Sequence, residues 1–139
     1  MQKRFYLDTC IWRDLLEDRK SNYSFLGENA FQFLRKCREN DCIVLVSSFV
    51  VSELETYFSK EQIFDLFEPF NDITLFVEPS KESIRLAYEI GEKSSAHYSD
   101  IVHALIAKEN ECVLITRDKH FNFLTELVKV LLPEEVDFS

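Results

Sequence analysis

Short apolar runs alternate along this chain with longer stretches in which apolar residues recur every three or four positions. The short runs are rich in Val, Ile, Leu and Phe, and they predict strands at residues 5–7, 43–46, 73–77, 112–115 and 127–131, the last of them at a sheet edge. The periodic stretches predict helices after Asp8, over residues 22–40, 48–58, 60–70 and 80–94, and from Asp100 onward. Strands separated by helices predict an α/β fold with a central parallel sheet.

Small polar residues stand at the expected starts of these helices, where their side chains accept hydrogen bonds from the first backbone N–H groups. The expected caps are Asp8 or Thr9, Ser47 and Ser48, Ser80, and Ser99. Each lies at or close to the end of a predicted strand or at the boundary of a helix, so the strand and helix assignments support one another.

Acidic residues occur where predicted strands end and where predicted helices begin. Asp8 and Asp118 each follow a strand. Glu53 lies just over one turn into a helix that follows a strand, and Asp100 opens the helix before the fourth strand. Right-handed β-α-β connections would bring all four to the carboxyl rim of the sheet, where open α/β sheets bind ligands. The alternative for each acid is a solvated helix cap or loop carboxylate.

Four carboxylates at one rim imply a cation. Without one they would repel each other and their pKa values would rise. Hard oxygen ligands suit Mg²⁺ or Mn²⁺, and such ions support the hydrolysis of phosphodiesters. Glu55 competes with Glu53 for a place in the site, but it is turned about 200° away on the same helix.

Composition limits the alternatives. The 139 residues form one domain, 1–139, with 46% hydrophobic residues, 2 Gly and 3 Pro. The net charge of −9 argues against non-specific nucleic-acid binding through a general positive field, although bound metal could supply positive charge locally. With only Gly27 and Gly91, glycine-rich phosphate-binding loops are excluded.

The cysteines and the apolar runs indicate the compartment. None of Cys10, Cys37, Cys42 and Cys112 forms a C-x-x-C pair, and Cys37 and Cys42 have no nearby His to complete a zinc site. Unpaired cysteines, no visible secretory signal and no apolar run long enough to span a bilayer predict a cytoplasmic protein without membrane association.

The ordered set of motifs resembles the PIN domain, and within that family the VapC-like ribonuclease toxins of prokaryotic toxin–antitoxin pairs. The matching segments, which span nearly the whole chain, are Tyr6-Leu7-Asp8-Thr9, Ser52-Glu53-Leu54, residues 99–107, and Thr116-Arg117-Asp118 with Phe121. The resemblance implies a three-layer α/β/α fold with sheet order 3-2-1-4-5. It also implies a Mg²⁺- or Mn²⁺-dependent endoribonuclease, a homodimer, and an antitoxin whose C-terminal segment lies over the active groove.

By the same resemblance, Asp8, Glu53, Asp100 and Asp118 would be the catalytic, metal-binding acids. Thr116 and Thr9 would orient them, the alternative for Thr116 being a simple turn hydroxyl. Cys10 departs from the family, which commonly has a small polar residue there.

Cationic and aromatic residues carry weaker predictions. Contacts with substrate phosphates are expected from Arg13, Arg117 and Lys119, although charged, solvated positions explain these residues equally well. His97 and His103 are expected to be structural, because a metal–water mechanism needs no histidine.

The segment at residues 60–70 carries Ile63, Phe64, Phe67 and Phe70, whose apolar surface indicates core packing or, alternatively, a dimer or partner surface. Two other functions stay open: a PIN nuclease of RNA processing without an antitoxin, and a non-enzymatic PIN-like interaction module.

Overall fold

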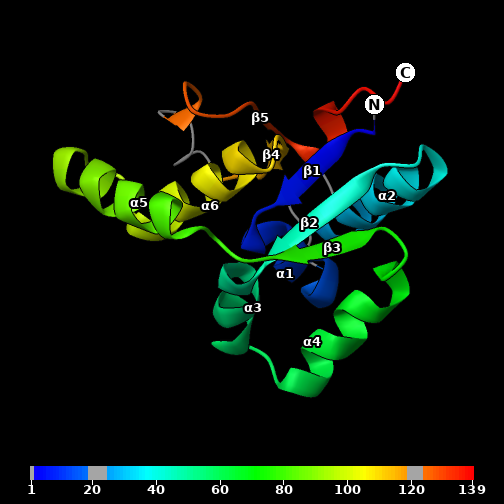
Figure 1. Cartoon of the computed structure of the whole chain (residues 1–139). Coiled ribbons are helices and arrows are strands. Elements are labelled where there is room, and N and C mark those ends of the chain that lie inside the picture. The colour runs from blue at the N-terminus through cyan, green and yellow to red at the C-terminus, as the bar shows by residue number, and fades with distance from the viewer. Residues whose placement is uncertain (1, 19–24, 119–123) are drawn as a thin grey trace.

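The computed structural model describes residues 2–18, 25–118 and 124–139 and contains a five-stranded, all-parallel sheet in the order β3-β2-β1-β4-β5 (Figure 1). The strands are β1 (Arg4–Leu7), β2 (Ile43–Ser47), β3 (Thr74–Val77), β4 (Val113–Ile115) and β5 (Val130–Leu131). This architecture confirms the α/β class and the sheet order that the resemblance implies. The strand closest to the N-terminus is therefore the central one.

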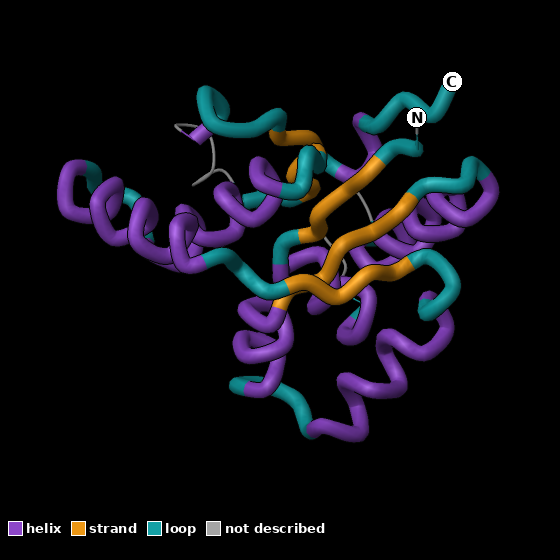
Figure 2. Tube along the Cα trace, viewed as in Figure 1, coloured by secondary structure: helices purple, strands orange, loops and turns teal. Residues whose placement is uncertain are grey.

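Helices cover both faces of the sheet, as Figure 2 shows. The α-helices are α1 (Thr9–Glu17), α2 (Leu26–Glu39), α3 (Ser48–Glu55), α4 (Lys60–Phe67), α5 (Lys81–Lys93) and α6 (Tyr98–Glu109). Short 3₁₀ helices lie at Glu68–Phe70 and Pro133–Glu135. Together they form the three-layer arrangement expected from the sequence.

The two faces can be followed from neighbouring residues of β1, because successive side chains of a strand point to opposite faces. Phe5 packs edge-on against Phe33 of α2, with ring centroids 5.2 Å apart. Tyr6 faces the other way and lies 5.6 Å from the ring of His103 in α6. Both residues are buried, so β1 has core on each side, as the continuous apolar run predicts.

The register of the strands aligns their carboxyl ends. Leu7 of β1 pairs with Ile115 of β4, so the residues that follow them, Asp8 and Thr116, stand level with each other. The backbone N–H of Asp8 donates to the carbonyl of Ile115 at 2.9 Å. The rim that was predicted to gather the acids is thus built by ordinary parallel pairing.

Several boundaries differ from the sequence predictions, and three of them have a clear local cause. Helix α6 begins at Tyr98, with His97 at its N-cap position and no side-chain cap, so Ser99 is not the cap and Asp100 lies in the first turn. Helix α3 stops at Glu55, because Ser59 caps α4 with a capping box a few residues later. Strand β5 is only two residues long, because the N–H groups of Leu127 and Val128 turn back to the carbonyl of Leu124.

The ends of the chain lie close together (Figure 1). Lys3 Nζ donates to the backbone carbonyl of Asp137 at 3.0 Å, and Phe138 packs against Phe5 and Phe33. All four cysteines are free thiols. Among the helices of the described segments, none is both long enough and apolar enough to cross a membrane.

Candidate active site

Asp8 follows β1 and is the N-cap residue of α1. Its Oδ1 accepts a hydrogen bond from the backbone N–H of Thr9 at 2.8 Å, which fixes the carboxylate at the start of the helix. Its Oδ2 accepts a second bond, from the hydroxyl of Thr116 at 3.0 Å. With only 6% of its surface exposed, Asp8 is a buried carboxylate held by two donors.

Thr116, the residue after β4, links two of the predicted acids. While its Oγ1 donates to Asp8, the same oxygen accepts the backbone N–H of Asp118 at 3.0 Å. The Sγ of Cys10 lies 3.5 Å from this hydroxyl. Thr116 therefore joins the end of β1 to the loop after β4. Its hydroxyl does more than stabilise its own turn, because it also bonds to Asp8.

Glu53, in the second turn of α3, reaches the same rim. Its Oε1 accepts a hydrogen bond from the hydroxyl of Thr9 at 2.8 Å and another from Nε2 of His103. Burial raises the pKa of Glu53. The hydrogen bond and the charge of His103, together with the hydrogen bond from Thr9, lower it by more, so the pKa of Glu53 lies below its usual range. Glu53 is thus an ionised carboxylate at neutral pH.

Asp100, in the first turn of α6, is half-buried and shows the opposite behaviour. Burial raises the pKa of this carboxyl, and the negative charges of Asp118 and Asp8 raise it further. Charges act on one another in this way only when they are near. The structure therefore brings Asp8, Asp100 and Asp118 into one electrostatic neighbourhood, with Glu53 joined to it through Thr9 and His103.

His103 is the residue of this site whose proximity to the acids the sequence analysis missed. It is buried, as a structural role predicts, but its Nε2 bonds to Glu53 and lies 3.7 Å from Oδ1 of Asp8. Burial lowers the pKa of His103, and the bond to Glu53 with the charges of the surrounding acids raises it by more. The signal was present in the sequence, since His103 lies one helical turn after Asp100 on the same side of α6.

The three cations predicted to contact phosphates have different surroundings. Arg117 forms a two-pronged ion pair with buried Asp14, with nitrogen–oxygen distances of 2.5 and 2.6 Å. Arg13 pairs with Glu17 at 3.1 Å and lies over the ring of Tyr57. Lys119 lies outside the residues that the structure describes. Contacts with phosphates stay predictions for all three.

The donor set fits a hard divalent cation, because it consists of carboxylates, whose oxygens are the ligands that such ions prefer. In residues 2–18, 25–118 and 124–139, however, no three acidic, His or Cys side chains are placed to hold one metal ion together. The carboxylates share one rim without forming a closed coordination shell.

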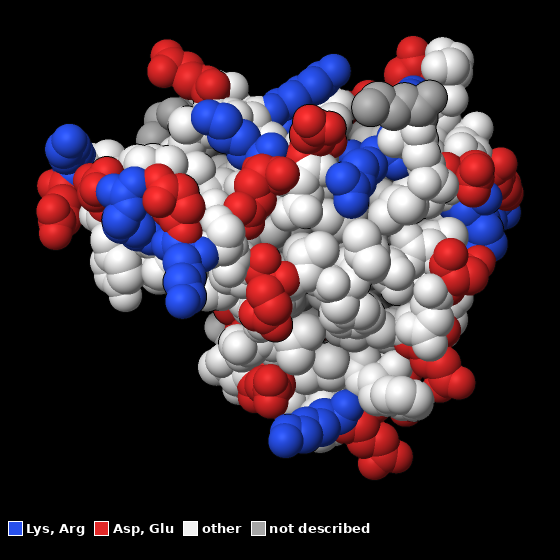
Figure 3. Space-filling model, viewed as in Figure 1, with Lys and Arg blue, Asp and Glu red and all other residues white. Residues whose placement is uncertain are grey.

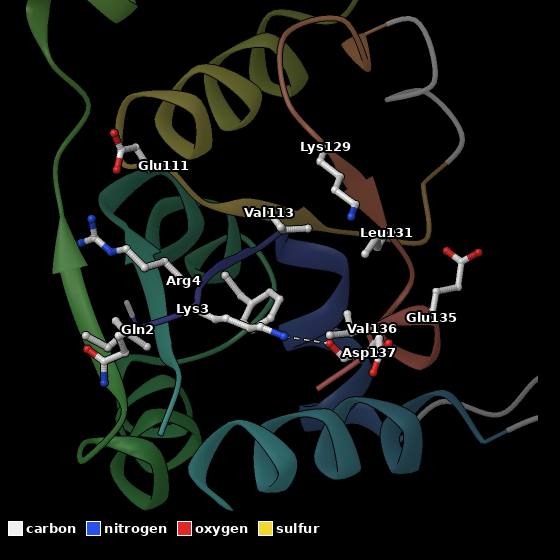
Figure 4. A pocket seen from close by; sticks show the side chains of 12 residues that line it. Gln2, Lys3, Arg4, Glu111, Val113, Lys129, Leu131, Glu135, Val136 and Asp137 are labelled. Atoms are coloured by element: carbon white, nitrogen blue, oxygen red, sulfur yellow. Dashed lines mark hydrogen bonds between the residues drawn. The ribbon is translucent and has the colours of Figure 1, made fainter. Parts of the chain in front are cut away.

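Two grooves differ in their relation to this rim. One of about 360 Å³ is lined by Thr116, Arg117 and Asp118 together with residues of and after β5. A larger one, of about 730 Å³, lies at the opposite end of the sheet, where Arg4, Ile43 and Val113 begin their strands (Figure 4). Three basic and three acidic residues line it, and Lys3 is bonded to the backbone of Asp137, so its charges balance and favour neither an anion nor a cation.

The visible surface carries no large basic area on the face drawn in Figure 3. Lys and Arg side chains there are interspersed with Asp and Glu, and uncharged side chains cover the centre of the face. This pattern agrees with the net charge of −9.

Comparison with protein families matches residues 5–126 to the PIN domain. A comparison with curated proteins finds no match. Among solved structures, the chain is similar to VapBC2 from Rickettsia felis bound to a DNA fragment from their promoter, with 17% identity, a TM-score of 0.68, and coverage of 93% of this chain and 98% of the other.

Two further structures are similar to a comparable degree. FitAcB from Neisseria gonorrhoeae is 16% identical, with a TM-score of 0.65 and coverage of 95% of this chain and 99% of the other. FitAB bound to an IR36 DNA fragment is 18% identical, with a TM-score of 0.62 and coverage of 96% and 97%. At these identities the three structures establish the shared fold.

Proposed function

The chain belongs to the PIN domain family, and from this premise we propose that it is a metal-dependent endoribonuclease that hydrolyses phosphodiester bonds in RNA. The observation that supports the proposal is the clustering of acids from separate elements at one rim. In particular, Thr116 bonds both to the carboxylate of Asp8 and to the backbone N–H of Asp118, and burial together with the charges of Asp118 and Asp8 raises the pKa of Asp100. Such crowding of carboxylates destabilises the metal-free fold, and a bound cation would offset this cost.

We assign metal binding to Asp8, Glu53, Asp100 and Asp118. A bound Mg²⁺ or Mn²⁺ would polarise the scissile phosphate and lower the pKa of the attacking water. Thr116 and Thr9 orient two of these acids through the hydrogen bonds to Asp8 and Glu53. Because Glu53 has a lowered pKa, it is ready to bind a cation at neutral pH without first losing a proton.

We also propose that the chain is the toxin of a type II toxin–antitoxin pair, a cytoplasmic homodimer controlled by an antitoxin. Support comes from the resemblance to VapC-like toxins and from the fold shared with the VapBC2 and FitAB assemblies. Exposed aromatic residues near the β3 edge also support a protein partner: Phe64 is 63% exposed and Phe76 is 53% exposed. In the segment at residues 60–70, Ile63, Phe67 and Phe70 are core residues.

The test of the nuclease activity uses purified full-length protein, a mixture of transfer and ribosomal RNA, and Mn²⁺. We expect cleavage by the wild type, no cleavage by Asp8→Asn or Asp100→Asn, and loss of activity when a chelator removes the metal. Circular dichroism checks that the variants fold. If the wild type cleaves no RNA and calorimetry detects no Mn²⁺ binding at millimolar concentration, the non-enzymatic interaction module is favoured instead.

The antitoxin is tested separately from the activity. A small protein encoded immediately upstream, which co-purifies with the chain and suppresses RNA cleavage, would support the toxin assignment. Cleavage without such a partner favours the nuclease of RNA processing.

A further inference from the structure

A buried chain of polar side chains leads to Glu53 from the core. Ser47 at the end of β2, Tyr6 of β1 and His103 of α6 are each at most 1% exposed. We propose that Tyr6 and His103 are positioning residues, which hold the Glu53 carboxylate in one orientation for metal binding. This inference rests on the proposed function, since it assigns Glu53 the role of a metal ligand.

The contacts of the chain are continuous. The Ser47 Oγ and the Tyr6 hydroxyl are 2.6 Å apart, and the Tyr6 hydroxyl is 2.6 Å from Nδ1 of His103. The other ring nitrogen, Nε2, bonds to Oε1 of Glu53. Four elements, β2, β1, α6 and α3, are thus connected by side chains alone, and the chain ends on the carboxylate.

Counting hydrogens fixes the donor at Glu53. The ionised carboxylate has no hydrogen to give, so Nε2–H of His103 donates to it. With a neutral ring, Nδ1 accepts from the Tyr6 hydroxyl, and Ser47 Oγ, which accepts the backbone N–H of Val50 at 3.2 Å as the cap of α3, gives its own hydrogen to the Tyr6 oxygen. With a doubly protonated ring, Nδ1–H donates to Tyr6 and Tyr6 donates to Ser47, while the bond to Glu53 stays the same.

Two donors converge on one oxygen of Glu53, because the hydroxyl of Thr9 bonds to the same Oε1 as His103. Glutamate has a long side chain with several rotatable bonds, and the side chain of Glu53 is 37% exposed, so it would otherwise sample many rotamers. Anchoring Oε1 restricts the position of Oε2. Groups that orient a ligand in this way commonly change metal affinity by 10–100-fold when they are removed.

The core of the experiment is Tyr6→Phe, which removes one hydroxyl and keeps the ring. Tyr57→Phe is the matched control, because Tyr57 is 59% exposed and takes no part in the series of hydrogen bonds from Ser47 to Glu53. We expect Tyr6→Phe to weaken Mn²⁺ binding about 10-fold in calorimetry and Tyr57→Phe to leave it unchanged. If the wild type binds Mn²⁺ and Tyr6→Phe binds it with equal affinity, the inference is overturned.

A second pair of variants separates positioning from packing. His103→Gln keeps an N–H donor on a flexible side chain, whereas His103→Leu fills the space without a donor. We expect the glutamine variant to retain more Mn²⁺ affinity than the leucine variant when the two melt at similar temperatures. Equal affinity in both would show that His103 acts only as a core residue.

Metal-free protein supplies a readout that is independent of the nuclease. In a long-range ¹H–¹⁵N spectrum we expect His103 Nε2 to carry a hydrogen, and its signals to shift in Glu53→Gln and in Tyr6→Phe. If Nε2 carries no hydrogen, the inference fails even when the enzyme is active. If the wild type binds no Mn²⁺, the proposed function fails and the role in metal binding fails with it, while the spectrum still shows whether the chain holds Glu53.

Discussion

The hydroxyl of Thr116 donates a 3.0 Å hydrogen bond to Oδ2 of Asp8 across 108 positions of sequence. Parallel pairing of β1 with β4 makes the contact possible, because Leu7 and Ile115 are in register and the next residue of each strand faces its counterpart. The contact turns a feature of sheet topology into a constraint on one carboxylate. Asp8 is thereby held from its own helix and from a neighbouring strand.

Replacing Thr116 with Val removes this hydroxyl at nearly constant volume. Asp8 loses a donor and Asp118 loses the acceptor of its backbone N–H, so both carboxylates gain freedom. We expect kcat/KM for RNA cleavage to fall about 10-fold or more, with weaker Mn²⁺ binding in calorimetry.

Thr116→Ser is the control for this prediction, because it keeps the hydroxyl and loses only a methyl group. It should retain most of the wild-type rate. If Thr116→Val and Thr116→Ser cleave RNA equally fast, the hydroxyl has no part in positioning Asp8.

Asp100→Asn should stabilise the metal-free protein while abolishing cleavage. Burial and the charges of Asp118 and Asp8 raise the pKa of Asp100 above its ordinary value of 3.8. A carboxyl with a raised pKa in the folded state favours folding below its unfolded pKa, and this contribution is lost as the pH rises through the folded pKa. At pH 7 the ionised Asp100 is therefore a cost to the fold, which asparagine removes.

The measurement is thermal unfolding in the presence of a chelator at several pH values. At pH 7 we expect Asp100→Asn to melt above the wild type, by about 4 °C for each kcal/mol of relieved repulsion. The difference should vanish as the pH approaches 3. Exposed Asp65 provides the control, since Asp65→Asn should change neither the melting temperature nor its pH dependence. A lower melting temperature for Asp100→Asn at pH 7 contradicts the proposed crowding.

The fold could be predicted from local patterns to a large extent. Four apolar runs predict β1 to β4, and helical periodicity predicts most helices, within a few residues. The reason is that the buried surface of each element requires apolar residues at regular positions in the sequence. The exact ends of helices and strands were harder to predict from the sequence. Helix α6 begins at Tyr98 because the backbone N–H of Ile101 donates to the carbonyl of His97. The N-cap residue makes no side-chain hydrogen bond, so no capping side chain marks this start in the sequence.

The acids of the candidate site could be predicted from the sequence, whereas the residues that hold them in place could be predicted less well. Asp8, Asp100 and Asp118 stand at or next to the ends of elements and Glu53 lies in the second turn of a helix that follows a strand, so topology alone suggests a common rim. The roles of Tyr6 and His103 depend on which face of β1 meets α6, and on side-chain contacts between residues far apart in sequence. Arg117 shows the same limit: its ion pair with Asp14 joins β4's end to α1 and leaves no trace in local sequence.

The ion pair of Asp14 and Arg117 should be important for stability. The side chain of Asp14 is 2% exposed, and the guanidinium binds it through two nitrogens. Removing one partner of a buried pair leaves the other charge poorly compensated, which costs about 3 kcal/mol or more. We expect Arg117→Ala and Asp14→Ala each to lower the free energy of unfolding by about this amount in urea titrations.

The double variant tests whether the two residues act as a pair. Asp14→Ala with Arg117→Ala should lose clearly less stability than the sum of the single changes, because the second substitution removes the charge that the first left behind. The control is Arg38→Ala, since Arg38 forms an exposed pair with Asp72 and should cost about 1 kcal/mol or less. Strict additivity at Asp14 and Arg117 would show that the two side chains contribute independently.

The two glycines of the chain should respond oppositely to alanine. Both lie inside helices with ordinary negative φ, so the difference is one of space. A Cβ on Gly27 would lie 2.7 Å from Cα of Asp18 and 2.8 Å from the carbonyl oxygen of Asp14, where α1 and α2 approach closely. Because these are backbone atoms, the helices would have to separate, and we expect a loss of about 1–3 kcal/mol for Gly27→Ala.

Among the residues that the structure describes, a Cβ on Gly91 meets only Cδ1 of Ile101, at an ordinary 3.7 Å. Alanine in a helix interior is favoured over glycine by about 1 kcal/mol, so Gly91→Ala should stabilise α5 by up to that amount. Urea unfolding of the two variants beside the wild type gives both values in one experiment. Since intrinsic helix propensity favours alanine at either position, a stabilising effect of Gly27→Ala would mean that α1 and α2 are not packed as closely as the structure has them.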